Sequence, residues 1–202
     1  MKGIIDFLCS SALEARALRE HFVFKIIPMI NVDGVINGNY RCSLSGQDLN
    51  RRYKNPSKQV HPVIFNIKKA IRPFAREREL ILYVDLHGHS RRKNMFMYGN
   101  NLKDRPHATR VFPYIFSKIC DFFSFESSRF SMSKYKDGTG RIAMFREIAI
   151  ANIFTLEASF CGADKGKYRD QHFTSEYLML SGRRLLESLI VYCKIDVAES
   201  IR

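Results

Sequence analysis

The sequence predicts an α/β protein, because segments with helical spacing of apolar residues alternate with short apolar runs typical of β-strands. One such run, at residues 80–84, leads directly to His87, and another, at residues 152–158, carries Glu157 near its end. Ligands and catalytic groups of α/β proteins collect at the carboxyl ends of strands. We therefore expect a functional site at one edge of a sheet that is flanked by helices.

The first third of the chain predicts two helices, a buried strand and a long loop. Apolar residues recur at helical spacing over 2–9 and 13–20, and residues 22–30 form a β-rich apolar run that ends at an Asn-x-Asp-Gly turn. Residues 34–57 contain four glycines or prolines, many polar residues and little periodicity, which predicts a long ordered loop. Loops of this length in a compact domain are usually functional. Helical spacing returns over 62–74.

The rest of the chain alternates between the two kinds of segment. After the strand that leads to His87, we expect a strand at 94–99, a helix at 111–123, a helix and a strand at 141–147 and 152–158, and a long helix at 174–192. With 202 residues, of which 46% are hydrophobic, the chain has enough apolar material for the core of one domain. No window of 18 uninterrupted apolar residues occurs, so we expect no membrane span.

The charge indicates an acidic partner. The chain has 33 lysines and arginines against 20 acidic residues, a formal net charge of +13. Nucleic acid remains one hypothesis, but the basic residues are dispersed and no DNA- or RNA-binding signature occurs. The five cysteines are also scattered, with no Cys-x-x-Cys pair, which indicates reduced thiols and a cytoplasmic location.

Several motifs, in this order, carry a family resemblance: Asn31-Val32-Asp33-Gly34, Asn39 to Leu44, Gly46 to Arg51, Asp85 to Ser90, and Phe154 to Gly162. With these motifs together, the chain resembles the zinc carboxypeptidases, specifically the cytosolic carboxypeptidases that remove glutamates from tubulin tails. The resemblance covers about residues 1–194. It implies a mixed twisted β-sheet flanked by helices, with residues 1–202 as part of a catalytic domain that lacks the first strands.

The resemblance also implies roles for particular residues. His87 matches a zinc ligand, and Glu157 matches the general base, which takes a proton from water and passes it to the leaving amine. Arg41 resembles the arginine that stabilises the oxyanion. Asp48 resembles the carboxylate that orients another zinc-binding histidine.

An exopeptidase must also bind the free carboxylate at the end of its substrate. A guanidinium with a neighbouring amide suits this task, and Asn50 and Arg51 resemble the family's carboxylate clamp. A glutamate side chain needs a further cation in its pocket. Arg141 resembles the residue best placed for that purpose, and Arg146 is the alternative. The implied substrates are glutamylated tubulin tails or other acidic C-terminal peptides, in the cytoplasm and at microtubules or cilia.

The zinc ligand set is incomplete in this sequence. The family takes two further ligands from a His-x-x-Glu motif that would lie just upstream of Met1. None of the histidines is followed by a glutamate three residues later (His21, His61, His87, His89, His107 and His172). We therefore expect the chain alone to be inactive, as part of a longer carboxypeptidase. Two alternatives remain: a zinc-free module that binds acidic tails through Arg41, Asn50, Arg51 and Arg141, and a nucleic-acid-binding domain.

Overall fold

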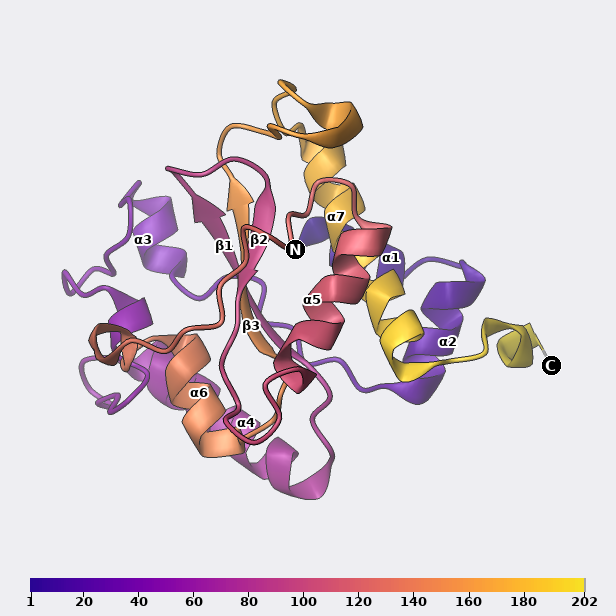
Figure 1. Cartoon of the computed structure of the whole chain (residues 1–202). Helices are drawn as coiled ribbons and strands as arrows, with labels where there is room; N and C mark the ends of the chain where they lie inside the picture. The colour runs from indigo at the N-terminus through magenta and orange to yellow at the C-terminus, as the bar shows by residue number, and fades with distance from the viewer. Residues whose placement is uncertain (202) are drawn as a thin grey trace.

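The structure, a computed structural model, describes residues 1–201 and consists of a mixed β-sheet with helices on both faces (Figure 1). Its strands are β1 (Tyr83–His89), β2 (Met95–Tyr98) and β3 (Ile153–Ser159), arranged in the order β1-β3-β2. Strand β1 runs parallel to β3, whereas β2 is antiparallel to it. The predicted mixed α/β arrangement is therefore confirmed.

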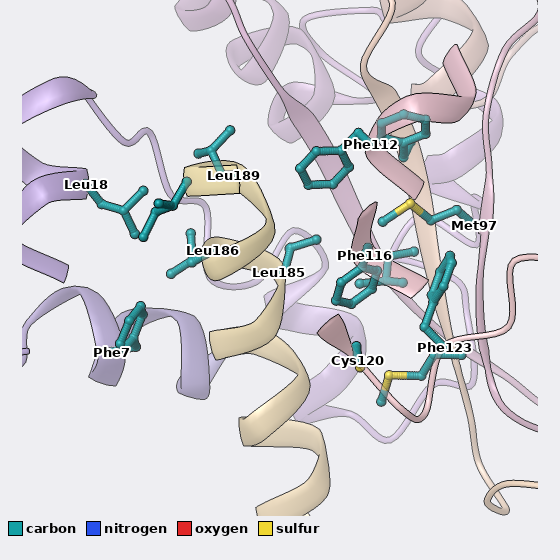
Figure 2. Packing of buried hydrophobic residues seen from close by; sticks show 14 of the residues in the cluster. Phe7, Leu18, Met97, Phe112, Phe116, Cys120, Phe123, Leu185, Leu186 and Leu189 are labelled. Atoms are coloured by element: carbon teal, nitrogen blue, oxygen red, sulfur yellow. The ribbon is translucent and has the colours of Figure 1, made fainter. Parts of the chain in front are cut away.

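Four helices cover one face of the sheet: α1 (Lys2–Leu8), α2 (Leu13–His21), α5 (Ala108–Ile119) and α7 (Ser175–Cys193). Helix α7 lies in the middle of this layer and packs in two directions (Figure 2). Leu186 points toward Leu18 of α2 and Phe7 of α1, while Leu185 lies on the side of Phe116 from α5. Side chains from alternate positions of the strands, including Met97 and Leu156, complete this core.

Helices α4 (Pro62–Glu77) and α6 (Gly140–Ile148) cover the other face and form a second, smaller core with Tyr53 and Ile153. Lys68 on α4 is buried there. Its ammonium group forms an ion pair with Glu147 on α6 and donates a hydrogen bond to the Tyr53 carbonyl. Because a buried charge is costly without partners, these contacts fix α4 against α6 and against the loop before it.

The predicted loop at 34–57 is confirmed apart from two short helical segments, α3 (Val32–Ile36), which begins just before it, and η1 (Leu49–Arg51). Further single turns are η2 (Lys134–Lys136), η3 (Gly166–Tyr168) and η4 (Val197–Ile201). The Asn31 side chain accepts a hydrogen bond from the Gly34 amide and donates to the carbonyls of Arg41 and Cys42. One side chain thus ties the start of the loop to residues 41–42.

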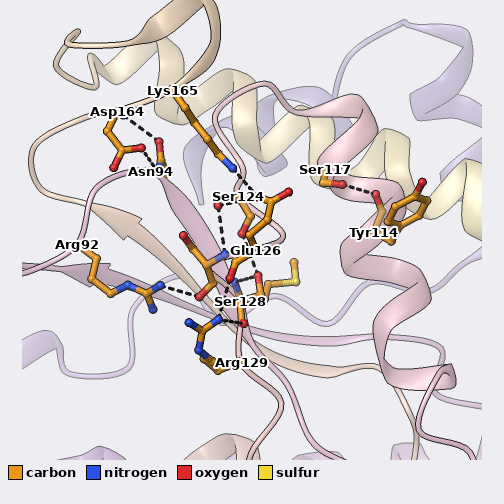
Figure 3. Close-up of polar contacts among 12 residues, drawn as sticks. Arg92, Asn94, Tyr114, Ser117, Ser124, Glu126, Ser128, Arg129, Asp164 and Lys165 are labelled. Atoms are coloured by element: carbon orange, nitrogen blue, oxygen red, sulfur yellow. Dashed lines mark hydrogen bonds and ion pairs between the residues drawn. The ribbon is translucent and has the colours of Figure 1, made fainter.

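The turn between β1 and β2 is tied to the segment after β3. Asn94 has φ 65°, a conformation that asparagine tolerates better than most residues. Its backbone amide donates to the Gly162 carbonyl at 2.8 Å, and its side-chain amide donates to Asp164 at 2.6 Å (Figure 3). These contacts hold the ends of neighbouring strands in place beside the candidate site.

The strand predicted at 22–30 is wrong. The segment is irregular, and Val23, Ile26, Ile27 and Met29 are between 37% and 52% exposed. No strand of the described residues pairs with it, and apolar β-propensity produces a strand only where a neighbouring strand and a packed face are present. Several boundaries also differ from the predicted ones. Strand β1 spans Tyr83–His89 rather than 80–84, α5 spans Ala108–Ile119 rather than 111–123, and α4 extends to Glu77. Among the described residues, no helix is long and apolar enough to cross a membrane.

Candidate active site

His87 and Glu157 face each other across two parallel strands. They are register partners in β1 and β3, so their side chains emerge on the same face of the sheet. The ladder continues to the pair His89 and Ser159, which places His87 inside β1 rather than after it. This register brings together two residues that are 70 positions apart in sequence.

Asp85 holds the His87 ring. The two residues are two positions apart in β1 and therefore share a face, and Nε2 of His87 lies 2.8 Å from Oδ2 of Asp85. Burial by itself lowers the pKa of His87, but the Asp85 carboxylate and the nearby Glu157 outweigh burial and raise it. A metal-binding histidine typically donates its second ring N–H to a carboxylate in this way, and here Nδ1 is the nitrogen left for a metal.

Glu157 carries a buried carboxylate that has no hydrogen-bond or ion-pair partner among the described residues. Its residue is 8% exposed, and within residues 1–201 no hydrogen bond or ion pair reaches its carboxylate. Burial raises the pKa of Glu157, and the positive charges of His87, Lys136 and Arg41 oppose this effect. A carboxylate with a raised pKa that remains unbonded is suited to accept and release a proton.

Asp48 lies close to two of the arginines that were predicted to contact the substrate. Its Oδ2 lies 3.4 Å from Nη1 of Arg41 and 3.9 Å from Nη1 of Arg51, and its Oδ1 accepts a hydrogen bond from the Asn50 amide at 2.9 Å. The guanidinium of Arg41 also lies over the Tyr40 ring. Both arginine side chains remain nearly half exposed, so both can reach a substrate.

The segment that carries Asn50 and Arg51 is fixed to the start of α6. Oδ1 of Asn50 accepts a hydrogen bond from the Gly140 amide at 2.9 Å, which leaves its NH2 group for a ligand. The Tyr53 amide donates to the Gly138 carbonyl at 3.0 Å. A Cβ atom at Gly138 would lie 2.4 Å from the Arg51 carbonyl oxygen, so this close approach requires glycine.

Arg141 and Arg146 are placed differently from each other. Arg141 is buried, and its Nη1 donates to the Gly99 carbonyl and to Oδ1 of Asn100, the latter at 2.7 Å. Burial lowers the pKa of Arg141 to about 10. Arg146 lies at the surface, where both of its terminal nitrogens contact Asp137 at 2.8 Å. The guanidinium of Arg146 is therefore already paired within the chain, whereas Arg141 has only neutral partners among the described residues.

Two residues of this site were not predicted from the sequence. Asp85 could have been found, because a residue two positions before a strand histidine shares its face. Lys136 lies in η2, and its ammonium group is 5.0 Å from the centroid of the Tyr98 ring. Its charge opposes the raised pKa of Glu157. No sequence pattern identifies Lys136, since a loop folds it toward β2.

The described residues do not form a complete zinc site. Within residues 1–201, no group of three or more His, Cys, Asp or Glu side chains could hold a metal ion. His87, supported by Asp85, fits the role of one nitrogen ligand. A catalytic zinc needs about three protein ligands, so the other two would have to come from elsewhere.

Comparisons with known proteins identify the family of the chain. Residues 2–144 match the family described as zinc carboxypeptidase. The chain is 46% identical over 201 residues to cytosolic carboxypeptidase 3 from Bos taurus and 47% identical over 199 residues to cytosolic carboxypeptidase 2 from Mus musculus, in both cases over 97% of its length. It spans only 20% and 23% of these two relatives.

The fold is shared with solved structures. A metallo-carboxypeptidase from Burkholderia cenocepacia matches with a TM-score of 0.82 at 20% identity, over 96% of this chain and 52% of that chain. A metallo-carboxypeptidase from Pseudomonas aeruginosa matches with a TM-score of 0.78 over 100% of this chain and 53% of that chain. From the match over residues 2–144, we conclude that the chain belongs to the zinc carboxypeptidase family.

Proposed function

We propose that this chain contributes the general base and one zinc ligand to a metallocarboxypeptidase that removes glutamates from acidic C-terminal tails. The observation that supports this most strongly is the pairing of His87 with Glu157 in adjacent parallel strands, with Asp85 behind the histidine. Family membership supports the reaction class. The chain spans about a fifth of the length of these relatives, so the activity of the whole enzyme is part of this proposal.

The chemistry that these residues suit is the hydrolysis of a peptide bond. Glu157 takes a proton from the attacking water and gives it to the leaving amine, for which its buried and unbonded carboxylate is suited. Arg41 stabilises the negative charge that develops on the carbonyl oxygen. A bound zinc ion would supply the polarisation of the scissile carbonyl.

Substrate recognition follows from the cations that surround this pair. The NH2 group of Asn50 and the guanidinium of Arg51 bind the terminal carboxylate, and Arg141 or Arg146 compensates the glutamate side chain. We favour Arg141 as the cation for the glutamate side chain, because the Arg146 guanidinium already forms an ion pair with Asp137. We propose glutamylated tubulin tails as the substrate, in the cytoplasm and at microtubules or cilia. The names of the cytosolic carboxypeptidase relatives support the carboxypeptidase reaction and the cytoplasmic location.

A second candidate is a zinc-free module that holds acidic tails with the same arginines. The incomplete zinc site favours this second function, because no three candidate metal ligands come together among the described residues. Metal content separates the two functions. A form of the protein that binds one zinc per chain and releases glutamate from a glutamate-ended peptide supports the enzyme. A form that binds this peptide without zinc or glutamate release supports the module.

A further inference from the structure

A basic hollow of about 510 Å3 lies at the outer edge of β2 and is lined by none of the residues His87, Glu157, Arg41 and Arg51. Three of its lining residues are the cations Lys103, Arg110 and Arg129, together with Phe130 and neutral side chains. No aspartate or glutamate lines it, although Asp104 directly follows Lys103 in the sequence. The hollow therefore concentrates positive charge in a concave surface.

The hollow lies along the outer edge of β2, whereas His87 lies on β1, at the opposite edge of the sheet. The Arg129 amide donates to the Met97 carbonyl at 2.9 Å, and the Gly99 amide donates to the Arg129 carbonyl, so this segment runs along the free edge of β2. Phe130 packs against the core under α5 and α7. Arg129 is the bridge partner of Tyr98 in β2, and Glu157 lies on the next strand inward, β3.

The three cations are not neutralised by carboxylates. Within the described part of the chain, neither Lys103 nor Arg110 nor Arg129 forms an ion pair. Nη1 of Arg129 donates to the carbonyls of Glu126 and Ser128 at 2.7 and 2.8 Å, and Nη1 of Arg110 donates to the Pro106 carbonyl (Figure 3 shows Arg129). The Glu126 carboxylate, which is the closest acidic group in sequence to Arg129, is paired with Lys165 instead. Each guanidinium thus retains its full charge and further N–H donors.

The aromatic ring in the hollow is already covered. The Arg110 guanidinium lies 4.8 Å from the Phe130 centroid, and a Cβ atom at Gly99 would lie 2.5 Å from the Phe130 ring. A single-stranded nucleic acid needs open aromatic faces on which bases stack. Carboxylates need only the cations and donors that remain available here. The hollow therefore suits an acidic peptide better than a nucleic acid.

We propose that this hollow is a second binding site, which holds glutamate or aspartate side chains of an acidic peptide outside the His87 and Glu157 centre. The choice of a peptide rests on the proposed function, whereas the anion site follows from Lys103, Arg110 and Arg129. A tail that is held here and at the active site gains affinity, because the second contact becomes intramolecular.

The test is the binding of a fluorescein-labelled ten-glutamate peptide with an amidated C-terminus, measured by fluorescence anisotropy at low salt. The amide removes the free carboxylate that Arg51 is proposed to bind. We expect Arg110→Gln with Arg129→Gln to raise the Kd about tenfold, and Lys103→Gln alone to raise it about threefold, within the range for exposed ion pairs. Lys103 has no hydrogen bond or ion pair in the described residues, so its substitution reports on binding without disturbing the fold.

The matched control is Lys69→Gln with Arg76→Gln on α4, which removes the same charge from exposed positions on the other face. An equal loss of affinity in this control would mean that only the net charge matters, and would overturn the proposal. An unchanged Kd in Lys103→Gln and in the double variant would also overturn it. The same variants are also tested with a fluorescein-labelled oligonucleotide. If they lose oligonucleotide binding but keep peptide binding, the hollow is a nucleic-acid site and the proposal is overturned. Glutamate release plays no part in this measurement, so its outcome is independent of the proposed activity.

Discussion

Glu157 of β3 is the register partner of His87 of β1, and Asp85 lies 2.8 Å from the His87 ring on the same face. Parallel pairing fixes the two strands relative to each other along their whole length, so the relative position of the two side chains is a property of the sheet rather than of a loop. Rigid elements hold reactive groups more precisely than loops do. The proposed general base and zinc ligand are therefore positioned together.

Glu157→Gln tests the general base. In a form of the protein that releases glutamate, we expect kcat to fall by about 100-fold or more, because general-base catalysis contributes about 10²–10⁴-fold. Peptide affinity stays within about twofold, since the amide has nearly the same shape. Steady-state kinetics and peptide binding are the measurements, with circular dichroism to confirm folding. Retention of wild-type kcat would reject the assignment.

Asp85→Asn tests the support of His87. The substitution removes the carboxylate that holds the ring, and we expect zinc affinity to fall about 10–100-fold in a form that binds zinc, as is usual for such partners. Competition with a chelating dye measures this affinity. Asp33→Asn, an exposed carboxylate in α3, is the control and should change nothing. If both variants bind zinc like the parent protein, Asp85 does not support a ligand.

Arg51→Ala tests the carboxylate clamp. We expect the Kd of a peptide with a free C-terminus to rise about tenfold or more, because a charge-assisted hydrogen bond contributes about 1.5–3 kcal/mol. The amidated form of the same peptide should bind almost unchanged. Isothermal titration with the two peptides makes the comparison. Equal losses for both would show that Arg51 contributes only general charge.

The sequence predicted most of the fold because its helices have clear periodicity and its three strands stand out as short apolar or alternating runs. Helix α7, for example, carries an apolar stripe over 175–193 that packs between two layers. The run at 22–30 has the same apolar character as a strand but lacks a partner in the described residues, and periodicity does not reveal the partner. The wrongly predicted strand and the confirmed strands therefore differ in tertiary context.

Only part of the candidate site could be predicted from the sequence, for a similar reason. His87 and Glu157 follow from strand ends and from motifs, whereas the neighbours that tune them come from tertiary contacts. The charge of Lys136 reaches Glu157 from a helical turn more than 20 positions away in sequence. The bond between Asn50 and the Gly140 amide likewise joins two segments that no local pattern connects. Whether these residues contact a substrate stays a prediction.

Phe116→Ala tests the larger core. The ring is fully buried between α5 and α7 and lies 4.7 Å from the Phe123 centroid, so we expect unfolding free energy to fall by about 3–5 kcal/mol. Val111→Ala on the same helix is 44% exposed and should cost no more than about 0.5 kcal/mol. Urea denaturation of both variants measures the difference. Similar losses in the two variants would contradict the packing described for α5.

Thiol reactivity tests the burial of Cys120. Its residue is 1% exposed, and burial raises the pKa of its thiol to about 12, so the reactive thiolate is scarce near neutral pH. Cys9 and Cys161 are exposed. With a disulfide reagent at pH 8, we expect these two to react within seconds and Cys120 only on unfolding. Modification of Cys120 at the rate of Cys161 in the folded protein would contradict its position in the core.

The most direct test of the central claim is zinc content and glutamate release, measured on this 202-residue chain beside a longer form that extends upstream through a His-x-x-Glu motif. We predict one zinc per chain and release of glutamate from a glutamate-ended peptide in the longer form, and neither in the shorter one. Glu157→Gln in the longer form should retain zinc and lose release. A longer form that neither binds zinc nor releases glutamate would contradict the enzyme and favour a module that only binds acidic tails.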